Sequence, residues 1–271
     1  ITCITSSAGC SSWFPNSLGV KQGDIMSPIL YSCYISKLAE KLKGRGVDLG
    51  DGQGRIGILL YADDILAETA EELQSMLNIV SDFADAMRFV FSTGLDQKKS
   101  AWMAYGADIG GMAEVPVWLG GERIPLVEKY LYLGVLLQHT GSWIPHLKRM
   151  RSLLGLRASE MNQVGLHRHG FHGKVARTLI KMEVNPVVEY ASGVWYCSPS
   201  QAQSLGISTA WNALVRQAVG VPPSTSIEAV MGDLDLVDHP ARRWRMHRVM
   251  QFYRMASRPA ASISRRVLAL W

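Results

Sequence analysis

The chain has 271 residues, of which 48% are hydrophobic, and its net charge at pH 7 is +5. This hydrophobic content is enough for the core of one large domain or two smaller ones. The sequence has no apolar run long enough to span a membrane and no basic-then-apolar leader, so it supports neither a membrane span nor a secretory signal. We expect a soluble, intracellular protein, nuclear or cytoplasmic, and the first residue, Ile1, suggests a piece of something longer.

The charge is distributed unevenly along the chain. Residues 1–140 carry 11 basic and 16 acidic side chains, whereas residues 141–271 carry 17 basic and 7 acidic ones. This asymmetry is typical of a protein that gathers cations with one half and neutralises phosphates with the other. The alternative is that the basic residues are only the solvated faces of helices.

The first predicted element is a glycine-bearing loop that leads into a helix. The loop contains Gln22-Gly23-Asp24, and Ser27 with Pro28 forms a helix start, with Ser27 at the N-cap and Pro28 at the first helical position. Apolar residues then recur every four positions, with two more beside them: Leu30, Tyr34, Leu38 and Leu42, with Tyr31 and Ile35. We therefore expect a helix with one apolar face, which can pack under the next element.

The second predicted element is a β-hairpin with two acidic residues at its tip. Apolar runs at residues 56–60 and 65–67 flank Tyr61-Ala62-Asp63-Asp64. Adjacent carboxylates at the edge of a buried sheet need a compensating cation, and carboxylate oxygens suit Mg²⁺ or Mn²⁺. The pattern therefore indicates a metal site and phosphoryl transfer. An ordinary polar turn that contains two Asp is the alternative, because Asp is favoured in turns.

The glycines of Gly52–Gly57 match the spacing of a dinucleotide-binding loop, but they stand before a strand and not between a strand and a helix. We interpret this segment as a flexible turn into the hairpin.

A long helix and short strands follow the hairpin. Thr69 and Glu72 form a capping box, and apolar residues at steps of three and four predict a helix that ends near Phe91. Residues 94–100 lead into a short strand, Gly120-Gly121 predicts a hairpin, and residues 129–135 predict another strand.

From Trp143 onward the pattern is helical. In the first helix an apolar stripe, Ile144, Leu147, Met150, Leu153 and Leu154, is accompanied by basic residues, Lys148, Arg149, Arg151 and Arg157. Further helices are predicted at 171–183, 186–197, 200–219, 226–231 and 239–257, and Thr225 with Glu228 forms a second capping pair.

The cysteines and histidines do not indicate a metal site. Four cysteines lack the paired spacing of a zinc site, and their low number fits a reducing compartment: Cys3, Cys10, Cys33 and Cys197. Three histidines and two basic residues cluster at His167, Arg168, His169, His172 and Lys174. Their spacing fits no zinc pattern, so we favour a polar loop or a phosphate-facing patch over a metal site.

Four of these segments, in this order, resemble the sequence blocks of reverse transcriptases. They are the Gln22-Gly23 loop with its helix, the Tyr61–Asp64 hairpin, the block that contains Lys99, and the Tyr132-Leu133-Gly134 block. The chain is identified on them as a partial reverse transcriptase (RNA-directed DNA polymerase) of a non-LTR, or LINE-type, retrotransposon. Gln22-Gly23-Asp24 followed by Ser27-Pro28 favours this branch over the group II intron enzymes.

The resemblance implies an α+β fold. Residues 1–138 would form a partial right-hand polymerase palm, an antiparallel sheet with packed helices. Residues 139–219 would form a helical thumb, and residues 220–271 a helical connector.

The resemblance also implies a mechanism and roles for single residues. The parent enzyme would extend a DNA primer on an RNA template from deoxynucleotide triphosphates, by two-metal nucleotidyl transfer with Mg²⁺ or Mn²⁺. Asp63 would be the main metal ligand, and Asp64 would assist it or orient the ligands.

Further roles are implied around this metal site. Tyr61, Ala62, Gln22 and Gly23 would border the nucleotide and template. Lys99 would neutralise or protonate the departing pyrophosphate, with a plain surface lysine as the alternative. The primer-grip hairpin would be formed by Tyr132, Leu133 and Gly134.

The sequence departs from the family pattern at its beginning. Reverse transcriptases carry a further catalytic Asp on a strand before the Gln-Gly loop, and none of residues 1–18 is acidic. We therefore expect this chain alone to lack polymerase activity. The alternative is a non-catalytic remnant of a retrotransposon polymerase that still binds nucleic acid. No membrane association is expected, and no protein partner can be inferred.

Overall fold

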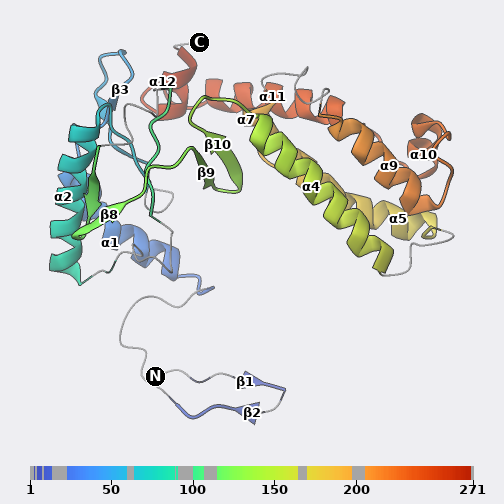
Figure 1. The fold of residues 1–271 in the computed structure, drawn as a ribbon, viewed down its shortest axis with the longest axis horizontal. Helices are drawn as coiled ribbons and strands as arrows, with labels where there is room; N and C mark the ends of the chain where they lie inside the picture. Colours follow the sequence, from blue (N-terminus) through green and yellow to red (C-terminus); the bar gives the residue numbers. More distant parts are fainter. Residues whose placement is uncertain are drawn as a thin grey trace. The chain divides into compact units, whose positions relative to one another are not determined.

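The computed structural model describes residues 3, 5–7, 9–13, 23–59, 64–88, 90, 100–106, 115–163, 170–196 and 205–269. The chain divides into two compact units (Figure 1). The first comprises Ile1–Lys99 with Val117–Arg123, and the second comprises Ser100–Pro116 with Ile124–Trp271. This is a division by packing, and the predicted division into palm, thumb and connector remains a prediction.

The first unit combines two long helices with short hairpins. In chain order its elements are β1 (Thr5–Ser6), β2 (Gly9–Cys10), α1 (Ser27–Lys41), β3 (Val47–Asp48), β4 (Arg55–Ile56), β5 (Ile58–Leu59), β6 (Asp64–Ile65), α2 (Ala70–Met87), β7 (Val117–Leu119) and β8 (Glu122–Ile124). Each strand pairs with one neighbour, which gives separate two-stranded sheets. The α+β class is thus confirmed in its coarse form, with small antiparallel sheets beside helices.

Helix α1 begins at the predicted place, with one correction. Its N-cap is Met26, so Ser27 and Pro28 both lie inside the first turn. No side chain caps the helix, so the cap expected of Ser27 is absent. The Asp24 carboxylate accepts a hydrogen bond from the Met26 N–H, 2.8 Å away, which stabilises the turn before the helix. The predicted apolar face is buried only in its second half. Leu38 and Leu42 are buried, whereas Leu30 is exposed.

Helix α2 carries most of the core of the first unit. The Thr69 hydroxyl accepts from the Glu72 N–H at 3.1 Å, which confirms the predicted cap. The buried face of the helix consists of Ala70, Met76, Leu77, Val80, Phe83 and Ala84. The helix ends at Met87, not near Phe91, because Arg88 turns the backbone into the left-handed region with φ 55°. Helix α1 packs against it through Tyr34, whose hydroxyl donates to the Met87 carbonyl at 3.0 Å.

The predicted hairpin at Gly120-Gly121 is confirmed between β7 and β8. Both glycines have positive φ, 59° and 82°, as the two central residues of a type I′ turn require. The Gln74 side chain holds β7 against α2: it accepts from the Trp118 N–H at 2.7 Å and donates to the Trp118 carbonyl at 3.0 Å.

The second unit consists of one hairpin and a set of helices. In chain order its elements are β9 (Lys129–Tyr132), β10 (Val135–Gln138), α4 (Ile144–Met161), α5 (Gly173–Leu179), a π-helical turn η2 (Ile180–Val184), α6 (Asn185–Glu189), α7 (Ser192–Trp195), α9 (Ile207–Val219), α10 (Ile227–Asp233), α11 (Pro240–Ala256) and α12 (Ile263–Ala269). The strand predicted after residues 94–100 is reduced to a single bridge between Trp102 and Leu126.

The helix predictions for this unit need four corrections. The helix expected at 200–219 begins at Ile207, because Gly206 before it is in the left-handed conformation with φ 62°. The helix expected at 186–197 is broken after Glu189, because Ala191 adopts the left-handed conformation with φ 52°. The cap of α10 is Ser226 and not Thr225: its hydroxyl accepts from the Ala229 N–H and donates to the Glu228 carboxylate. Helix α12 was not predicted. Among the described residues, no helix is both long and apolar enough to cross a bilayer.

The core of the second unit is built around tryptophans. Trp195, Trp211 and Trp244 are all buried, and the rings of Trp195 and Trp244 meet edge to face with centroids 5.4 Å apart. Each indole N–H has an acceptor. Trp244 donates to the Val188 carbonyl at 2.6 Å, and Trp211 donates to the Asn185 Oδ1 at 3.0 Å. These bonds fix the orientation of the helices and satisfy the buried donors.

Candidate active site

The predicted hairpin with acidic residues is present in the first unit. Strands β5 and β6 pair antiparallel, with Ile58 opposite Ile65 and Leu59 opposite Asp64. The Leu66 N–H donates to the Gly57 carbonyl at 2.9 Å and extends the pairing at the open end of the hairpin. Asp64 is therefore the first residue of the second strand, and it is partly exposed.

The base of this hairpin is seated by close backbone contact. A Cβ on Gly57 would lie 2.8 Å from the Arg45 carbonyl oxygen and 3.0 Å from the Cε of Met76. A Cβ on Gly46 would overlap the Cα of Gly57. Two glycines thus allow the start of the hairpin to lie directly on the segment before β3 and on α2. Arg55 and Ile56, which we read as part of a flexible turn, form strand β4 and pair with β3.

The loop before α1 is described from Gly23 onward. Gly23 has a φ of 85°, which disfavours any residue with a Cβ, although a Cβ there would meet open space. The protein itself therefore requires a glycine for the conformation of the backbone. The backbone conformation does not test the predicted role of Gly23 beside the template and nucleotide, which stays a prediction.

The residues of the predicted primer grip lie in the second unit, in hairpin β9–β10. Four residue pairs form the ladder, from Val135 opposite Tyr132 to Gln138 opposite Lys129. Leu133 and Gly134 form the two-residue turn, with φ 45° and 81°. The single strand expected at 129–135 is therefore wrong, because the chain reverses at Leu133, whereas the hairpin expected at Tyr132, Leu133 and Gly134 is present.

Two residues that the sequence did not point to hold this hairpin in place. The Tyr190 hydroxyl donates to the Leu133 carbonyl at 2.6 Å, and its ring lies 3.1 Å from the position of a Cβ on Gly134. The buried His146 accepts from the Leu136 N–H at 3.2 Å. Burial, with a smaller contribution from the Arg149 charge, lowers the pKa of His146 to about 4. His146 is therefore neutral at physiological pH, as its role as an acceptor requires.

Several predicted site residues lie outside the described residues. They are Gln22, Tyr61, Ala62, Asp63 and Lys99, together with His167, Arg168, His169 and Cys197. Of the two acidic residues of the hairpin, only Asp64 is described.

The donor chemistry of the hairpin fits a divalent cation of the Mg²⁺ type. Asp64 supplies a hard carboxylate oxygen, and Mg²⁺ is commonly held by one or two carboxylates together with substrate phosphates. Within the described part of the chain, no group of three His, Cys, Asp or Glu side chains gathers to form a protein-only metal cage. Cys3, Cys10 and Cys33, the cysteines among the described residues, are not in disulfide bonds.

The family model for reverse transcriptase (RNA-dependent DNA polymerase) matches residues 2–137, which is half of the chain. The chain belongs to the reverse transcriptase family. The matched segment contains the Gln22-Gly23 loop, hairpin β5–β6 and most of hairpin β9–β10. Membership makes this a chain of an RNA-directed DNA polymerase family, whose members use divalent metal ions, an RNA template, a primer and nucleotides.

Two curated relatives are similar to parts of this reverse transcriptase chain. It is 38% identical over 68 residues, 24% of the chain, to the retrovirus-related Pol polyprotein from type-1 retrotransposable element R2 of Nasonia vitripennis. It is 24% identical over 153 residues, 53% of the chain, to the RNA-directed DNA polymerase from mobile element jockey of Drosophila funebris. The predicted resemblance to reverse transcriptases of non-LTR retrotransposons is confirmed.

The matches cover 6% of the length of the R2 relative and 16% of the jockey relative. No solved structure matches the chain.

Proposed function

We propose that this chain is part of an RNA-directed DNA polymerase that extends a DNA primer along an RNA template. The observation that carries the proposal is the position of Asp64 on the second strand of hairpin β5–β6, inside the segment that matches the family model. A carboxylate fixed by strand pairing at the end of a short hairpin can meet a cation and the phosphates of a nucleotide at the same time.

In this proposal the residues of the hairpin hold the metal ions and those of the loops hold the substrates. Asp63 and Asp64 would bind Mg²⁺ or Mn²⁺, and the bound cations would supply electrostatic stabilisation of the charge that develops in nucleotidyl transfer. Gln22 and Gly23 would border the template and nucleotide. The turn at Leu133-Gly134 would hold the primer, and Lys99 would neutralise the pyrophosphate.

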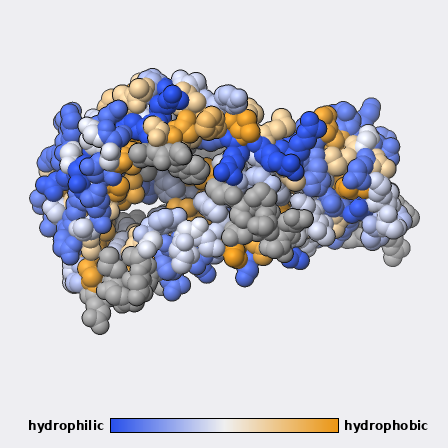
Figure 2. Space-filling model, turned by 90° about the horizontal axis from the view of Figure 1, so that it is seen from above, coloured by the Kyte–Doolittle hydropathy of each residue, from blue (hydrophilic) through white to orange (hydrophobic). Residues whose placement is uncertain are grey.

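The helical unit would act as thumb and connector and bind the nucleic-acid backbone. Support comes from α11, which carries Arg242, Arg243, Arg245, Arg248 and Arg254 and no acidic residue. Arg242 and Arg243 are in ion pairs with Asp238 and Glu189, which leaves part of this charge for phosphates. Exposed apolar residues of α11, among them Phe252 and Tyr253, add faces on which bases can stack. On the face drawn in Figure 2, hydrophobic and hydrophilic residues are interspersed.

We propose further that the chain alone binds primer–template but does not extend it, because it lacks the Asp that reverse transcriptases carry before the Gln-Gly loop. Binding should weaken steeply as salt is raised, since phosphate contacts release counterions. The experiment is a primer-extension assay on an RNA template with Mg²⁺ or Mn²⁺, together with a binding titration at several salt concentrations. Extension by the chain would refute the proposed inactivity, and the absence of any binding would count against the polymerase function.

A second candidate function is that of a non-catalytic remnant that only binds nucleic acid, which the basic surface of α11 favours by itself. The genomic sequence immediately upstream of the segment that encodes this chain distinguishes the polymerase from the remnant. An open frame that encodes a strand with a central Asp supports the polymerase, and stop codons support the remnant.

A further inference from the structure

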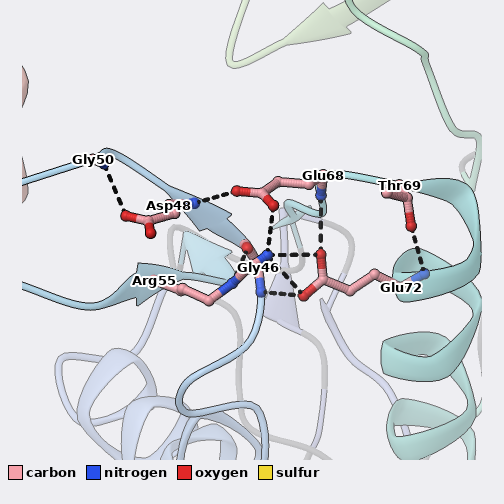
Figure 3. A network of polar contacts seen from close by, with 7 residues as sticks. All are labelled: Gly46, Asp48, Gly50, Arg55, Glu68, Thr69 and Glu72. Atoms are coloured by element: carbon pink, nitrogen blue, oxygen red, sulfur yellow. Dashed lines mark hydrogen bonds and ion pairs between the residues drawn. The ribbon is translucent and has the colours of Figure 1, made fainter. Parts of the chain in front are cut away.

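The hairpin that carries Asp64 is flanked by charged residues at both of its ends. Arg55 lies in β4, three residues before β5 begins, and Glu68 lies three residues after β6 ends. The Arg55 Nη2 is 2.8 Å from the Glu68 Oε2, so an ion pair joins the segment that enters the hairpin to the segment that leaves it (Figure 3).

A second carboxylate reinforces this ion pair. Glu72, in the first turn of α2, has its Oε2 3.2 Å from the same Nη2 of Arg55 and accepts from the Glu68 N–H at 3.1 Å. Its Oε1 accepts from the Gly46 N–H at 3.0 Å. This last bond, ahead of the charge of Arg55, lowers the pKa of Glu72.

The backbone around β3 is held by the same three side chains. The Arg55 Nε donates to the Gly46 carbonyl at 2.6 Å, and the Asp48 N–H donates to the Glu68 Oε1 at 2.7 Å. Figure 3 shows the three side chains converging from β4, from the segment after β6 and from α2. A network of this kind, with shared partners, restrains geometry more than an isolated surface ion pair does.

We propose that Arg55 is a positioning residue, which closes the base of the hairpin by pairing with Glu68 and Glu72 and so fixes the place of Asp64. The proposal that Asp64 binds metal rests on the proposed function, but closure of the hairpin does not. Without the guanidinium, two carboxylates face each other at the exit of the hairpin, and their repulsion moves that segment away from β4. The pairing of β5 with β6 then begins to open at the Leu66 N–H.

The test measures hydrogen exchange of the Leu66 amide by NMR in the full chain. Arg55→Ala should speed this exchange by about tenfold or more, while the amide of Val80 in α2 exchanges as in the unchanged chain. Arg45→Ala is the matched control: Arg45 also bonds to α2, through the Ser75 hydroxyl at 3.0 Å, but it does not join the ends of the hairpin. Its effect on Leu66 should be less than about twofold.

A conservative variant separates the effect of the positive charge of Arg55 from the effect of its several hydrogen-bond donors. Arg55→Lys keeps the positive charge but has no second nitrogen for the Gly46 carbonyl, so it should restore part of the protection. Unchanged exchange at Leu66 in Arg55→Ala would overturn the proposal. So would an equal rise at Leu66 and Val80, which would mean general destabilisation.

A Mn²⁺ titration links the closed hairpin to the proposed function. In the unchanged chain Mn²⁺ should broaden the amide signals of Ile65 and Leu66, and Arg55→Ala should need several times more Mn²⁺ for the same broadening. If the unchanged chain shows no broadening at the hairpin, the proposed metal site fails, and the exchange at Leu66 still decides whether Arg55 closes the hairpin. Equal Mn²⁺ dependence in both proteins would refute the positioning role.

Discussion

The second, mainly helical unit and the first unit are stabilised by different kinds of contact. In the helical unit, three buried tryptophans from different helices meet in one core, and each indole donates to an acceptor. In the first unit, the buried side chains of α2 are mainly aliphatic, and its hairpins are held by charged or amide side chains that bond to backbone groups. Apolar burial therefore dominates the one unit, and directional polar contacts are prominent in the other.

This difference matters for the site. Asp64 lies in the unit where polar bonds hold the hairpins, so we expect its position to respond to the loss of one side chain, Arg55. The predicted primer grip lies in the unit with the tryptophan core, where Tyr190 and His146 hold its hairpin by single hydrogen bonds. Four predictions test this contrast between the units.

The largest effect is expected from Trp244→Ala. Trp244 is 2% exposed and packs on Trp195, and its removal also leaves the Val188 carbonyl without its donor. The free energy of unfolding of the helical unit should fall by about 4 kcal/mol. Urea denaturation followed by far-UV circular dichroism measures this loss. Tyr253→Ala on the same helix, where the side chain is 67% exposed, is the control and should cost less than about 1 kcal/mol. Similar losses of unfolding free energy in the two variants would contradict the conclusion that buried tryptophans stabilise this unit.

His146 should make the stability of the helical unit depend on pH. Its pKa is about 4 in the folded protein and near its ordinary value of 6.5 in the unfolded chain, so the unfolded chain binds the proton more readily. The stabilisation is complete above pH 6.5 and is lost as the pH falls toward 4, by roughly 3 kcal/mol.

Denaturation at a series of pH values tests this dependence. His146→Gln keeps an acceptor for the Leu136 N–H but does not titrate, so it should flatten the slope between pH 4 and 6.5. An unchanged slope would show that other groups cause the pH dependence.

Gly46→Ala should disturb the first unit through its backbone. A Cβ there overlaps the Cα of Gly57, and φ is 95°, so we expect a loss of about 2 kcal/mol or more. Gly50→Ala is the matched control: it also has positive φ, but its Cβ meets open space, and only the conformational strain of about 1 kcal/mol remains. Exchange of the buried amide of Leu77 measures both. Equal effects would mean that close approach to Gly57 is unimportant.

The smallest effect is expected from Gln74→Ala. This change removes two hydrogen bonds to the backbone of Trp118 and should weaken the attachment of β7 to α2 by about 1 kcal/mol. Exchange of the Trp118 amide reports the change. Asn78→Ala, one turn further along α2, removes only a bond to Gln74 and should leave that amide nearly unaffected. Faster exchange in the control than in Gln74→Ala would refute the assignment.

The sequence predicted those features that are encoded locally. The apolar runs around Tyr61–Asp64 predicted the β5–β6 hairpin, and the spacing of Thr69 and Glu72 predicted the start of α2, because strand alternation and capping depend on near neighbours. The ion pairs of Arg55 were missed, because β4 is only two residues long and its partners Glu68 and Glu72 are 13 and 17 positions away.

Features that depend on distant contacts, or on a backbone conformation that the residue type does not favour, could not be predicted. The break between α6 and α7 follows from the left-handed Ala191, and the Trp195 indole donates to the Tyr190 carbonyl beside it. Nothing in residues 186–197 signals this break. Tyr190 and Leu133 are 57 residues apart, and no spacing rule connects them. The burial of His146 depends in part on Trp195, 49 positions away in the sequence, whose ring lies with its centroid 6.0 Å from that of the imidazole.

The bond from Tyr190 to Leu133 has a mechanical consequence. The turn of the β9–β10 hairpin is tied at its tip to the end of α6, and β10 is tied to α4 through His146. Because one bond is at the turn and the other is along β10, together they restrict rotation of the hairpin relative to the helices. The turn at Leu133 and Gly134 should therefore move together with α4 and α6 whenever these helices change their tilt.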